Sequence, residues 1–404
     1  MADDPIPELG GKTPLQYADI KTLDNLADVG VLGRAATIPE GMPAGSDTAI
    51  LSIFGCDPRK YYAGRAPLEA AATGIKLSPG DIAYRCNMIS IEDGEKPFED
   101  KKILSHSAGS IEGHESDTLI RELFNAPLFR EATVKAGIKV YPGNSFRHIA
   151  VQNEINNDNI VLIPPHDHLG EKLGQHLPKG NENASVLENL IRLSHTFLDS
   201  HPINIHRRSE GKLPANCIWF WAEGTSIELP NFTKRYGKSG SMISAVPLCR
   251  GIGVLTGLEK IVVDGATGEL HTNYEGKVEA GVSVLEVKDF VTIHIEAPDE
   301  CTHNGDLKGK LQAIEWVDSR IIAPLMKKLS EKGVDYRMLV MSDHRTLSST
   351  RGHDSGLVPF VLYDSTTASA GNAEKSGLKF CETDAEKSGN ITSGTDLMNM
   401  LFGM

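Results

Sequence analysis

The chain has 404 residues, of which 40% are hydrophobic and 24% charged, and its 41 basic and 54 acidic residues give a net charge of −13. At roughly 150 residues per domain this length predicts two or three soluble domains, and no run approaches the roughly 18 apolar residues that a membrane span requires. The acidic balance argues against nucleic acid as a partner. The six dispersed cysteines contain no CxxC pair, which is typical of a cytoplasmic protein without a zinc knuckle.

The first clear element is a helix that follows Pro43 and Gly45, where Ser46 either caps or begins the helix. The middle of the chain combines predicted strands, loops and helices. A short apolar strand at 160–163 leads into HDHLGEKLGQHLPKGNENAS, which has the composition of an exposed loop, and a helix at 185–198 follows with Asn183 or Ser185 as its cap. This pattern predicts an inserted α+β domain.

Apolar β-branched runs typical of buried strands come late, at 242–248, 260–263, 289–295 and 337–341. Between the last two, 311–332 has apolar residues every three to four positions, which predicts a helix with a kink at Pro324. This β-helix-β order predicts an α/β fold with a doubly wound, mainly parallel sheet, whose ligands gather at the carboxyl ends of the strands. We expect one discontinuous domain, 1–60 with 253–404, interrupted by an inserted domain at 61–252.

Two polar clusters follow neighbouring predicted strands. Asp299 and His303 stand four residues apart after strand 289–295, Asp343 and His344 follow strand 337–341, and His353 comes nine residues later. Carboxylates and imidazoles are ligands of Zn, Mn and related divalent ions, so these clusters predict a two-metal site. Ser46 is open to two interpretations: an ordinary helix cap, or a nucleophile toward phosphorus.

Seven segments in order, from about Glu8 to the C-terminus, resemble the archaeal-type branch of cofactor-independent phosphoglycerate mutase, a family of the alkaline phosphatase superfamily. They are ELGGKTPLQYA, PAGSDTAILSIFG, YYAGRAPLEAAATGI, GKLPANCIWFW, HTNYEGK, HIEAPDECTHNGD and SDHRT. The resemblance implies an alkaline-phosphatase-like sheet with an inserted phosphoglycerate-binding domain. It also implies a phosphoserine enzyme of glycolysis that interconverts 3-phosphoglycerate and 2-phosphoglycerate.

By the same resemblance, Ser46 is the nucleophile beside a metal ion that Asp343 and His344 hold, and Asp299, His303 and His353 hold a second ion. Manganese is favoured for both ions, with zinc, cobalt and magnesium as alternatives, and no bisphosphoglycerate is required. The Gly-rich CRGIGVLTG lacks the G-x-G-x-x-G spacing, so no nucleotide cofactor is implied.

The resemblance also assigns the substrate-binding side chains. Arg65, Arg85 and Arg147, with His148 beside the last, lie in segments similar to the family's substrate-binding region. Arginine suits this task because its guanidinium grips a carboxylate or a phosphate with two hydrogen bonds. Lys277 in NYEGK resembles the family's lysine near the transferred phosphate and is expected to take part in catalysis.

This chain departs from the family pattern at two places. The family has a His where this chain has Ser110, and the sequence leaves open whether His106 or His114 takes its role. The family's first strand ends in Asp-Gly ahead of Met-Ala-Asp, and that Asp is a ligand of the serine-side metal. We therefore expect a further strand and an Asp before Met1, and we do not expect Asp3 or Asp4 to reach the site.

Other functions remain open on this evidence. One alternative keeps the superfamily chemistry in a metal-dependent phosphatase or a phosphopentomutase, although a long inserted domain rich in Arg argues against a simple hydrolase. The other is a catalytically impaired paralogue that binds phosphoesters without turnover. Product analysis with 3-phosphoglycerate separates the three.

Overall fold

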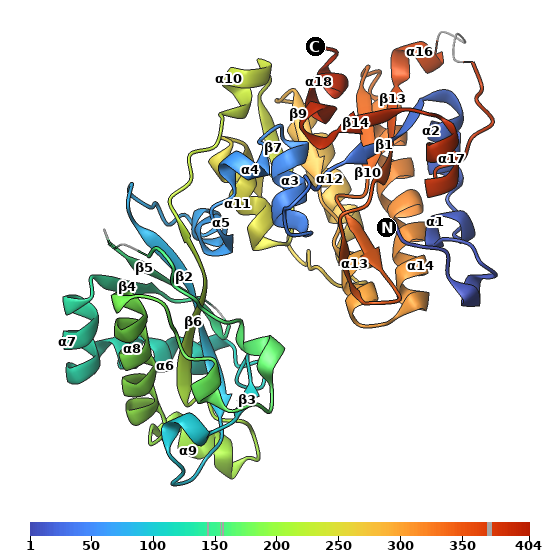
Figure 1. The fold of residues 1–404 in the computed structure, drawn as a ribbon. Coiled ribbons are helices and arrows are strands. Elements are labelled where there is room, and N and C mark those ends of the chain that lie inside the picture. Colours follow the sequence, from blue (N-terminus) through green and yellow to red (C-terminus); the bar gives the residue numbers. More distant parts are fainter. Residues whose placement is uncertain (144, 154, 156, 370–373) are drawn as a thin grey trace. The chain divides into compact units, whose positions relative to one another are not determined.

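A computed structural model describes residues 1–143, 145–153, 155, 157–369 and 374–404 (Figure 1). The chain forms two compact units: Met1–Tyr62 with Glu228–Met404, called here the split unit, and Ala63–Ile227, called the inserted unit. Among the described residues, no helix is both long and apolar enough to span a bilayer. The structure is an α/β fold with several sheets.

The split unit contains a parallel sheet of order β8-β7-β9. All four residues of its central strand β7 are buried, as expected for a strand that is paired on both sides. The strands are β7 (Gly240–Ile243), β8 (Glu259–Ile261) and β9 (Phe290–Ile293). The helices of this unit up to residue 303 are α1 (Pro14–Tyr17), α2 (Lys21–Val29), α3 (Ser46–Ile53), α4 (Pro58–Tyr61), α10 (Phe232–Tyr236), α11 (Pro247–Leu255), α12 (Tyr274–Leu285) and α13 (Ala297–His303).

A second sheet of the split unit is mixed and has the order β10-β13-β1-β14. The outer pair β1 and β14 is parallel, whereas β13 runs antiparallel to both β1 and β10. Its strands are β1 (Val31–Ala36), β10 (Arg337–Met341), β13 (Val358–Asp364) and β14 (Ile391–Ser393), and the small hairpin β11 (Arg345–Leu347) with β12 (Gly352–Asp354) follows β10. The remaining helices are α14 (Leu307–Trp316), α15 (Ala323–Glu331), α16 (Ser365–Ser369), α17 (Glu382–Lys387) and α18 (Leu397–Phe402).

The prediction that the last two apolar strands belong to one parallel sheet is wrong for the described structure. β9 pairs with β7, whereas β10 pairs antiparallel with β13 in the other sheet. The predicted helix between them exists but consists of α14, a π-helical turn at Val317–Ile322, and α15. Pro324 stands at the start of α15, where its missing N–H cannot continue the α-helical ladder, and the wider turn ahead of it accommodates this break.

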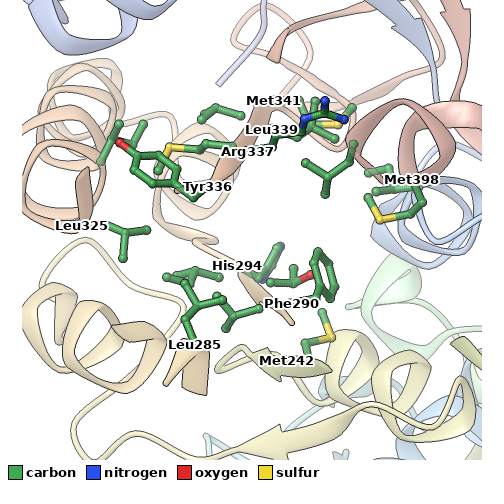
Figure 2. Close-up of a pocket in the computed structure, with 18 of the residues that line it drawn as sticks. Met242, Leu285, Phe290, His294, Leu325, Tyr336, Arg337, Leu339, Met341 and Met398 are labelled. Carbon is green, nitrogen blue, oxygen red and sulfur yellow. The ribbon is translucent and has the colours of Figure 1, made fainter. Parts of the chain in front are cut away.

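β9 and β10 are outer strands of their sheets, and both line one groove of about 780 Å³ (Figure 2). Its walls are largely apolar, from Phe290 on β9 to Leu339 on β10 and Met398 on α18, and Met1 also lines it. An outer strand leaves one row of backbone groups unpaired. The strand expected ahead of Met1 stays a prediction.

The inserted unit is an antiparallel sheet of order β3-β2-β5-β4, with β6 on the other side of β2. Every residue of β2 is buried, and Ile82, Tyr84, Cys86 and Met88 belong to the main hydrophobic core of this unit. The strands are β2 (Ile82–Ile91), β3 (Ile103–Ser105), β4 (Ile138–Tyr141), β5 (Arg147–Gln152) and β6 (Cys217–Thr225), and the helices are α5 (Arg65–Ala72), α6 (Gly113–Asn125), α7 (Pro127–Lys135), α8 (Glu182–Leu198) and α9 (Pro202–Ser209).

Three local expectations need correction. The cap of α8 is Asn181, whose side chain accepts from the backbone N–H of Ala184, because Asn183 is instead engaged in a buried hydrogen-bond network. The run 160–163 forms only an isolated β-bridge, between Val161 and Lys179, instead of the predicted strand. The chain enters the split unit at Glu228 rather than at 253, because β7 pairs with β8 and β9 of that unit.

Candidate active site

Ser46 begins α3, directly after Gly45, and its side chain is buried. The sequence left open whether Ser46 caps or begins the helix; the cap position belongs to Gly45. The Ser46 Oγ lies 3.0 Å from Nε2 of His344, which comes from the segment between β10 and β11. A hydroxyl at the first position of a helix faces unpaired backbone N–H groups, which favour negative charge.

The first polar cluster predicted from the sequence lies on α13 and the β11–β12 hairpin. Asp299 and His303 are one helical turn apart, with Oδ2 and Nε2 separated by 3.1 Å. His353, on β12, places Nε2 3.3 Å from Oδ1 of Asp299 and 3.0 Å from Nε2 of His303. Two imidazole nitrogens and a carboxylate therefore converge on one point.

The second predicted cluster meets the first through His344. Its ring centroid lies 4.1 Å from that of His353, and donor atoms of Asp299, His344 and His353 all lie within 4.8 Å of one another. Asp343 Oδ2 is 3.4 Å from His344 Nε2. The structure thus brings together Ser46 and all five of the predicted metal ligands, every one of them in the split unit.

The electrostatics of the cluster are those of a concentrated ligand set. Burial opposes ionisation of Asp299, but hydrogen bonds from His303 and His353 outweigh it and hold the pKa of that carboxyl well below its usual range. The hydrogen bond with Asp299 raises the pKa of His303 to about 9. Burial also opposes ionisation of Asp343, whereas the nearby His344 lowers the pKa of its carboxyl.

The donor set fits divalent metal ions. Asp343 Oδ2 is fully buried and has no hydrogen-bond partner among the described residues, which is costly for a carboxylate oxygen unless a cation faces it. His303 Nε2 and His353 Nε2 face each other at hydrogen-bond distance beside a carboxylate. Imidazole nitrogen and carboxylate oxygen are the ligands that zinc and manganese accept in proteins.

A buried layer of titratable groups lies beside the cluster, and only Lys277 was predicted from the sequence. Its ammonium is fully buried and donates to the carbonyl of His294 at 3.1 Å, and burial lowers the pKa of Lys277 to about 8. His294 Nε2 lies 3.3 Å from Glu296, whose pKa is raised to about 8 by burial and by the nearby carboxylates.

Sequence reasoning missed His294, Glu296 and Thr346. Thr346 donates from its hydroxyl to Oδ1 of Asp299 at 2.5 Å and so orients that carboxylate. The available signal was the segment HIEAPD, in which polar residues interrupt an apolar strand shortly before Asp299. A single polar residue inside such a run does not reveal which face of the strand it occupies.

Asp3 and Asp4 have other partners, as expected. Asp3 Oδ2 accepts from the Lys310 ammonium at 2.6 Å and from the Ser348 hydroxyl at 2.6 Å, and both charged side chains of this pair are buried. Asp4 is paired with Arg345. The Asp3–Lys310 pair is instead a structural contact behind the site, because Lys310 also donates to the backbone carbonyl of Thr346 at 2.8 Å.

In the inserted unit, two of the predicted arginines are linked to His166 through aromatic rings. Arg85 lies over Trp221, which packs against His166, and Arg147 lies over Phe146, which packs against His106 beside His166. Burial lowers the pKa of His166; Asp167 opposes this effect, and Arg85, Arg147 and Arg65 lower the pKa further. Arg85 is held by two hydrogen bonds from its guanidinium to Glu69 and lies over the Trp221 ring at 4.6 Å. The three arginines thus all act electrostatically on His166, and their role in substrate binding stays a prediction.

Unpartnered polar atoms mark the same cluster. Nδ1 of His106, Nε1 of Trp221 and Oδ1 of Asn87 are buried and have no hydrogen-bond partner among the described residues. His106 packs edge-on against His166 with ring centroids 5.9 Å apart. Buried polar groups without protein partners indicate a place where a polar ligand completes the hydrogen bonding.

His148 is not part of this cluster. Its ring is buried, with Nδ1 accepting from the N–H of Gly143 at 3.0 Å and Nε2 lying 3.3 Å from the Ser116 hydroxyl. Successive residues of a strand point to opposite faces, so His148 points away from the side occupied by Arg147. His106 lies near the arginines, whereas His114 is exposed; which of the two takes the role of the family's histidine stays a prediction.

Comparisons with known proteins agree along the whole chain. A family model described as 2,3-bisphosphoglycerate-independent phosphoglycerate mutase matches residues 27–204. Proteins of that name from Methanosarcina acetivorans and Methanosarcina barkeri are each 42% identical, over 99% of this chain and 97% and 96% of their own. The solved structure of the PH0037 protein from Pyrococcus horikoshii is 28% identical with a TM-score of 0.78, covering 100% of this chain and 94% of that one.

Proposed function

The chain belongs to the 2,3-bisphosphoglycerate-independent phosphoglycerate mutases, and from this membership we propose that it interconverts 3-phosphoglycerate and 2-phosphoglycerate through a phosphoserine at Ser46. The observation that carries the proposal is the 3.0 Å contact between Ser46 Oγ and His344 Nε2, inside a cluster of carboxylates and imidazoles. The fold is then of the alkaline phosphatase type, and the enzyme acts in the cytoplasm.

His344 is oriented for this task by its surroundings. Its Nδ1 lies 3.2 Å from the carbonyl oxygen of Arg345, which accepts a hydrogen bond from a protonated Nδ1. Nε2 then keeps its lone pair on the side of Ser46, where it is available to the ion that would be held there together with Ser46. The first turn of α3 favours the negative charge that develops when Ser46 carries a phosphoryl group.

Two divalent ions, with manganese favoured, complete the site in this proposal. Asp343 and His344 with Ser46 would hold one ion, and Asp299, His303 and His353 the other. Bound there, the ions would lower the pKa of the Ser46 hydroxyl and offset the charge of the phosphate. Lys277 adds a buried cation with a pKa of about 8, so it can hold or release a proton near neutral pH.

Substrate recognition is assigned to Arg65, Arg85 and Arg147 of the inserted unit, together with His106 and His166. Guanidinium groups match the carboxylate and phosphate of phosphoglycerate with paired hydrogen bonds. The unpartnered Nδ1 of His106 offers a further donor or acceptor. The substrate is a small molecule, and neither nucleic acid nor a membrane is required.

The test supplies 3-phosphoglycerate and Mn²⁺ and measures 2-phosphoglycerate and free phosphate. The mutase yields 2-phosphoglycerate with little phosphate, a phosphatase yields phosphate, and an impaired paralogue yields neither. Ser46→Ala should abolish turnover, whereas Ser52→Ala, which removes an unpartnered buried hydroxyl from the same helix, should leave turnover intact. Full activity of Ser46→Ala would refute the phosphoserine mechanism.

A further inference from the structure

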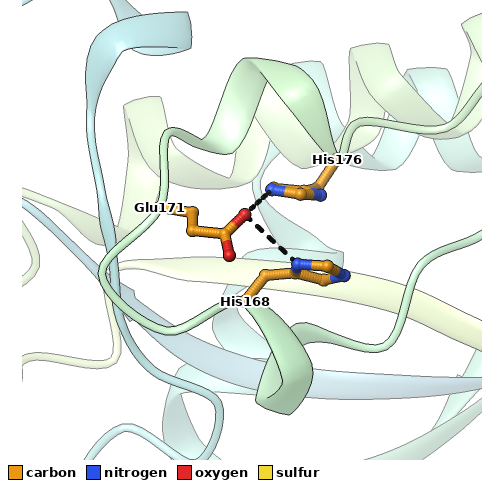
Figure 3. Close-up of side chains that lie close together, drawn as sticks. All are labelled: His168, Glu171 and His176. Atoms are coloured by element: carbon orange, nitrogen blue, oxygen red, sulfur yellow. Dashed lines mark hydrogen bonds and ion pairs between the residues drawn. The ribbon is translucent and has the colours of Figure 1, made fainter.

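A second group of metal-ligand side chains lies in the inserted unit, and neither the mutase reaction nor substrate binding assigns a role to any of the three. Figure 3 shows His168, Glu171 and His176 converging from the loop that includes the 3₁₀ turns Pro165–His168 and Leu173–Gln175. Nε2 of His176 and Nδ1 of His168 lie 2.8 and 3.3 Å from the same Oε2 of Glu171. The two imidazole rings stack with centroids 3.9 Å apart.

The loop backbone holds these side chains in place. Gly170 donates to the carbonyl of Ile103 at 2.7 Å, Ile103 donates to the carbonyl of Glu171 at 3.1 Å, and Leu173 donates to Lys101 at 2.9 Å. These bonds attach the loop along β3, which is the outer strand of its sheet. A ligand set on an anchored backbone loses little conformational entropy when it binds an ion.

The three donor atoms all lie within 4.8 Å of one another, close enough to face one ion. Ligand atoms about 2.0–2.1 Å from a tetrahedral zinc ion are about 3.3 Å from one another. His168 Nδ1 stands at that distance from the Glu171 oxygen, and His176 Nε2, at 2.8 Å, would move outward by about 0.5 Å on binding. The side chain of His176 is 11% exposed, that of His168 29% and that of Glu171 49%, so one side of the group faces solvent. Water can therefore supply a fourth ligand.

We propose that His168, Glu171 and His176 form an auxiliary binding site for a Zn²⁺-class divalent cation, separate from the ions of the reaction. Backbone hydrogen bonds already hold the loop on β3, so the ion occupies the site without positioning the turn that carries His166, and phosphoryl transfer stays in the split unit. His166 lies two residues away but has a different environment, because its ring faces Trp221 at 5.0 Å. The cation site and the arginine cluster thus use different side chains of one loop.

A carboxylate that accepts hydrogen bonds from two imidazole N–H groups would have the same geometry without a metal. Zinc instead binds an imidazole nitrogen that carries no proton. Zinc that is counted on the full-length protein and lost when these histidines are replaced separates the two interpretations.

The experiment counts zinc in the full-length protein after equilibration with Zn²⁺ at mildly alkaline pH and removal of the excess. Because the reaction site also binds divalent ions, the informative quantity is the difference between variants. His168→Ala with His176→Ala should lose one zinc per chain and retain wild-type mutase turnover. The matched control is His114→Ala with His206→Ala, which removes two exposed histidines of the same unit and should leave the zinc count unchanged.

The single variant His168→Gln provides a second measurement at a partly exposed position, should the double variant fold poorly. It should release the auxiliary zinc at a lower chelator concentration than wild type does, with mutase turnover unchanged. The proposal is overturned if either variant retains the zinc count and chelator resistance of wild type. It is also overturned if the zinc lost from the double variant is lost equally from the control.

Discussion

Replacing Lys310 by Met tests the buried ion pair that ties the first residues to the active-site hairpin. The side chain of Lys310 is fully buried and that of Asp3 is 2% exposed. Lys310→Met removes the charge at similar volume, but it leaves the Asp3 carboxylate buried with only the Ser348 and backbone hydrogen bonds. Breaking such a pair from one side costs about 3–5 kcal/mol, because the remaining charge is uncompensated.

The loss of stability in Lys310→Met should affect the unfolding of the split unit and leave that of the inserted unit unchanged. With a urea dependence of about 2–3 kcal/mol per M, a loss of about 4 kcal/mol shifts the midpoint by about 1–2 M. Trp316 is the single tryptophan of that unit, whereas Trp219 and Trp221 belong to the other, so fluorine NMR of 5-fluorotryptophan protein follows each unit separately. We expect the Trp316 resonance to change at lower urea than in wild type.

The double variant Asp3→Leu with Lys310→Met removes both charges and should recover most of the loss, to within about 1 kcal/mol of wild type. Lys327→Ala serves as the control, because that lysine is 76% exposed, its contact with Glu331 is 3.8 Å, and such a pair contributes less than about 0.5 kcal/mol. A double variant as unstable as Lys310→Met alone would refute the ion-pair argument and point to packing instead.

Three further outcomes follow. Burial lowers the pKa of His148 from 6.5 to about 4, so the unfolded chain binds more protons than the folded chain between these pH values, and this histidine should lower the free energy of unfolding by about 3 kcal/mol from pH 6.5 to 4. His148→Asn should make thermal stability fall less steeply over this pH range, and an unchanged pH dependence would contradict the lowered pKa of His148. Arg85→Lys loses the two-pronged contact with Glu69 and the stack on Trp221, so KM should rise about tenfold, equivalent to about 1.5 kcal/mol, and an unchanged KM would remove Arg85 from substrate binding. Exhaustive chelation should abolish mutase turnover and Mn²⁺ should restore it; turnover that survives chelation would refute the assigned ions.

Local chemistry made much of the site predictable from the sequence. Asp299 and His303 are four residues apart on one helix, and Asp343 and His344 follow a strand whose bounds, 337–341, match β10. Ser46 begins its helix because Gly45 and Pro43 precede an apolar run. Each of these features depends on neighbours within a few residues, and patterns of spacing and composition report such neighbours directly.

Long-range pairing was not predictable in the same way. The antiparallel pairing of β10 with β13, the return to the split unit at Glu228 and the capping of α8 by Asn181 all depend on residues far away in the chain or on competing side-chain partners. An apolar strand satisfies its backbone equally well beside several others, so its pattern alone does not select the partner.

By itself, therefore, the sequence determined the family and identified Ser46 and the carboxylate and imidazole residues that meet beside it, because these depend on short motifs. The tertiary structure alone decided that Asp3 pairs with Lys310, that His106 rather than His114 or His148 lies beside the arginines, and that His168, Glu171 and His176 meet. Burial and hydrogen bonding assign a side chain to one partner among several of suitable chemistry, and both quantities exist only once the chain has folded.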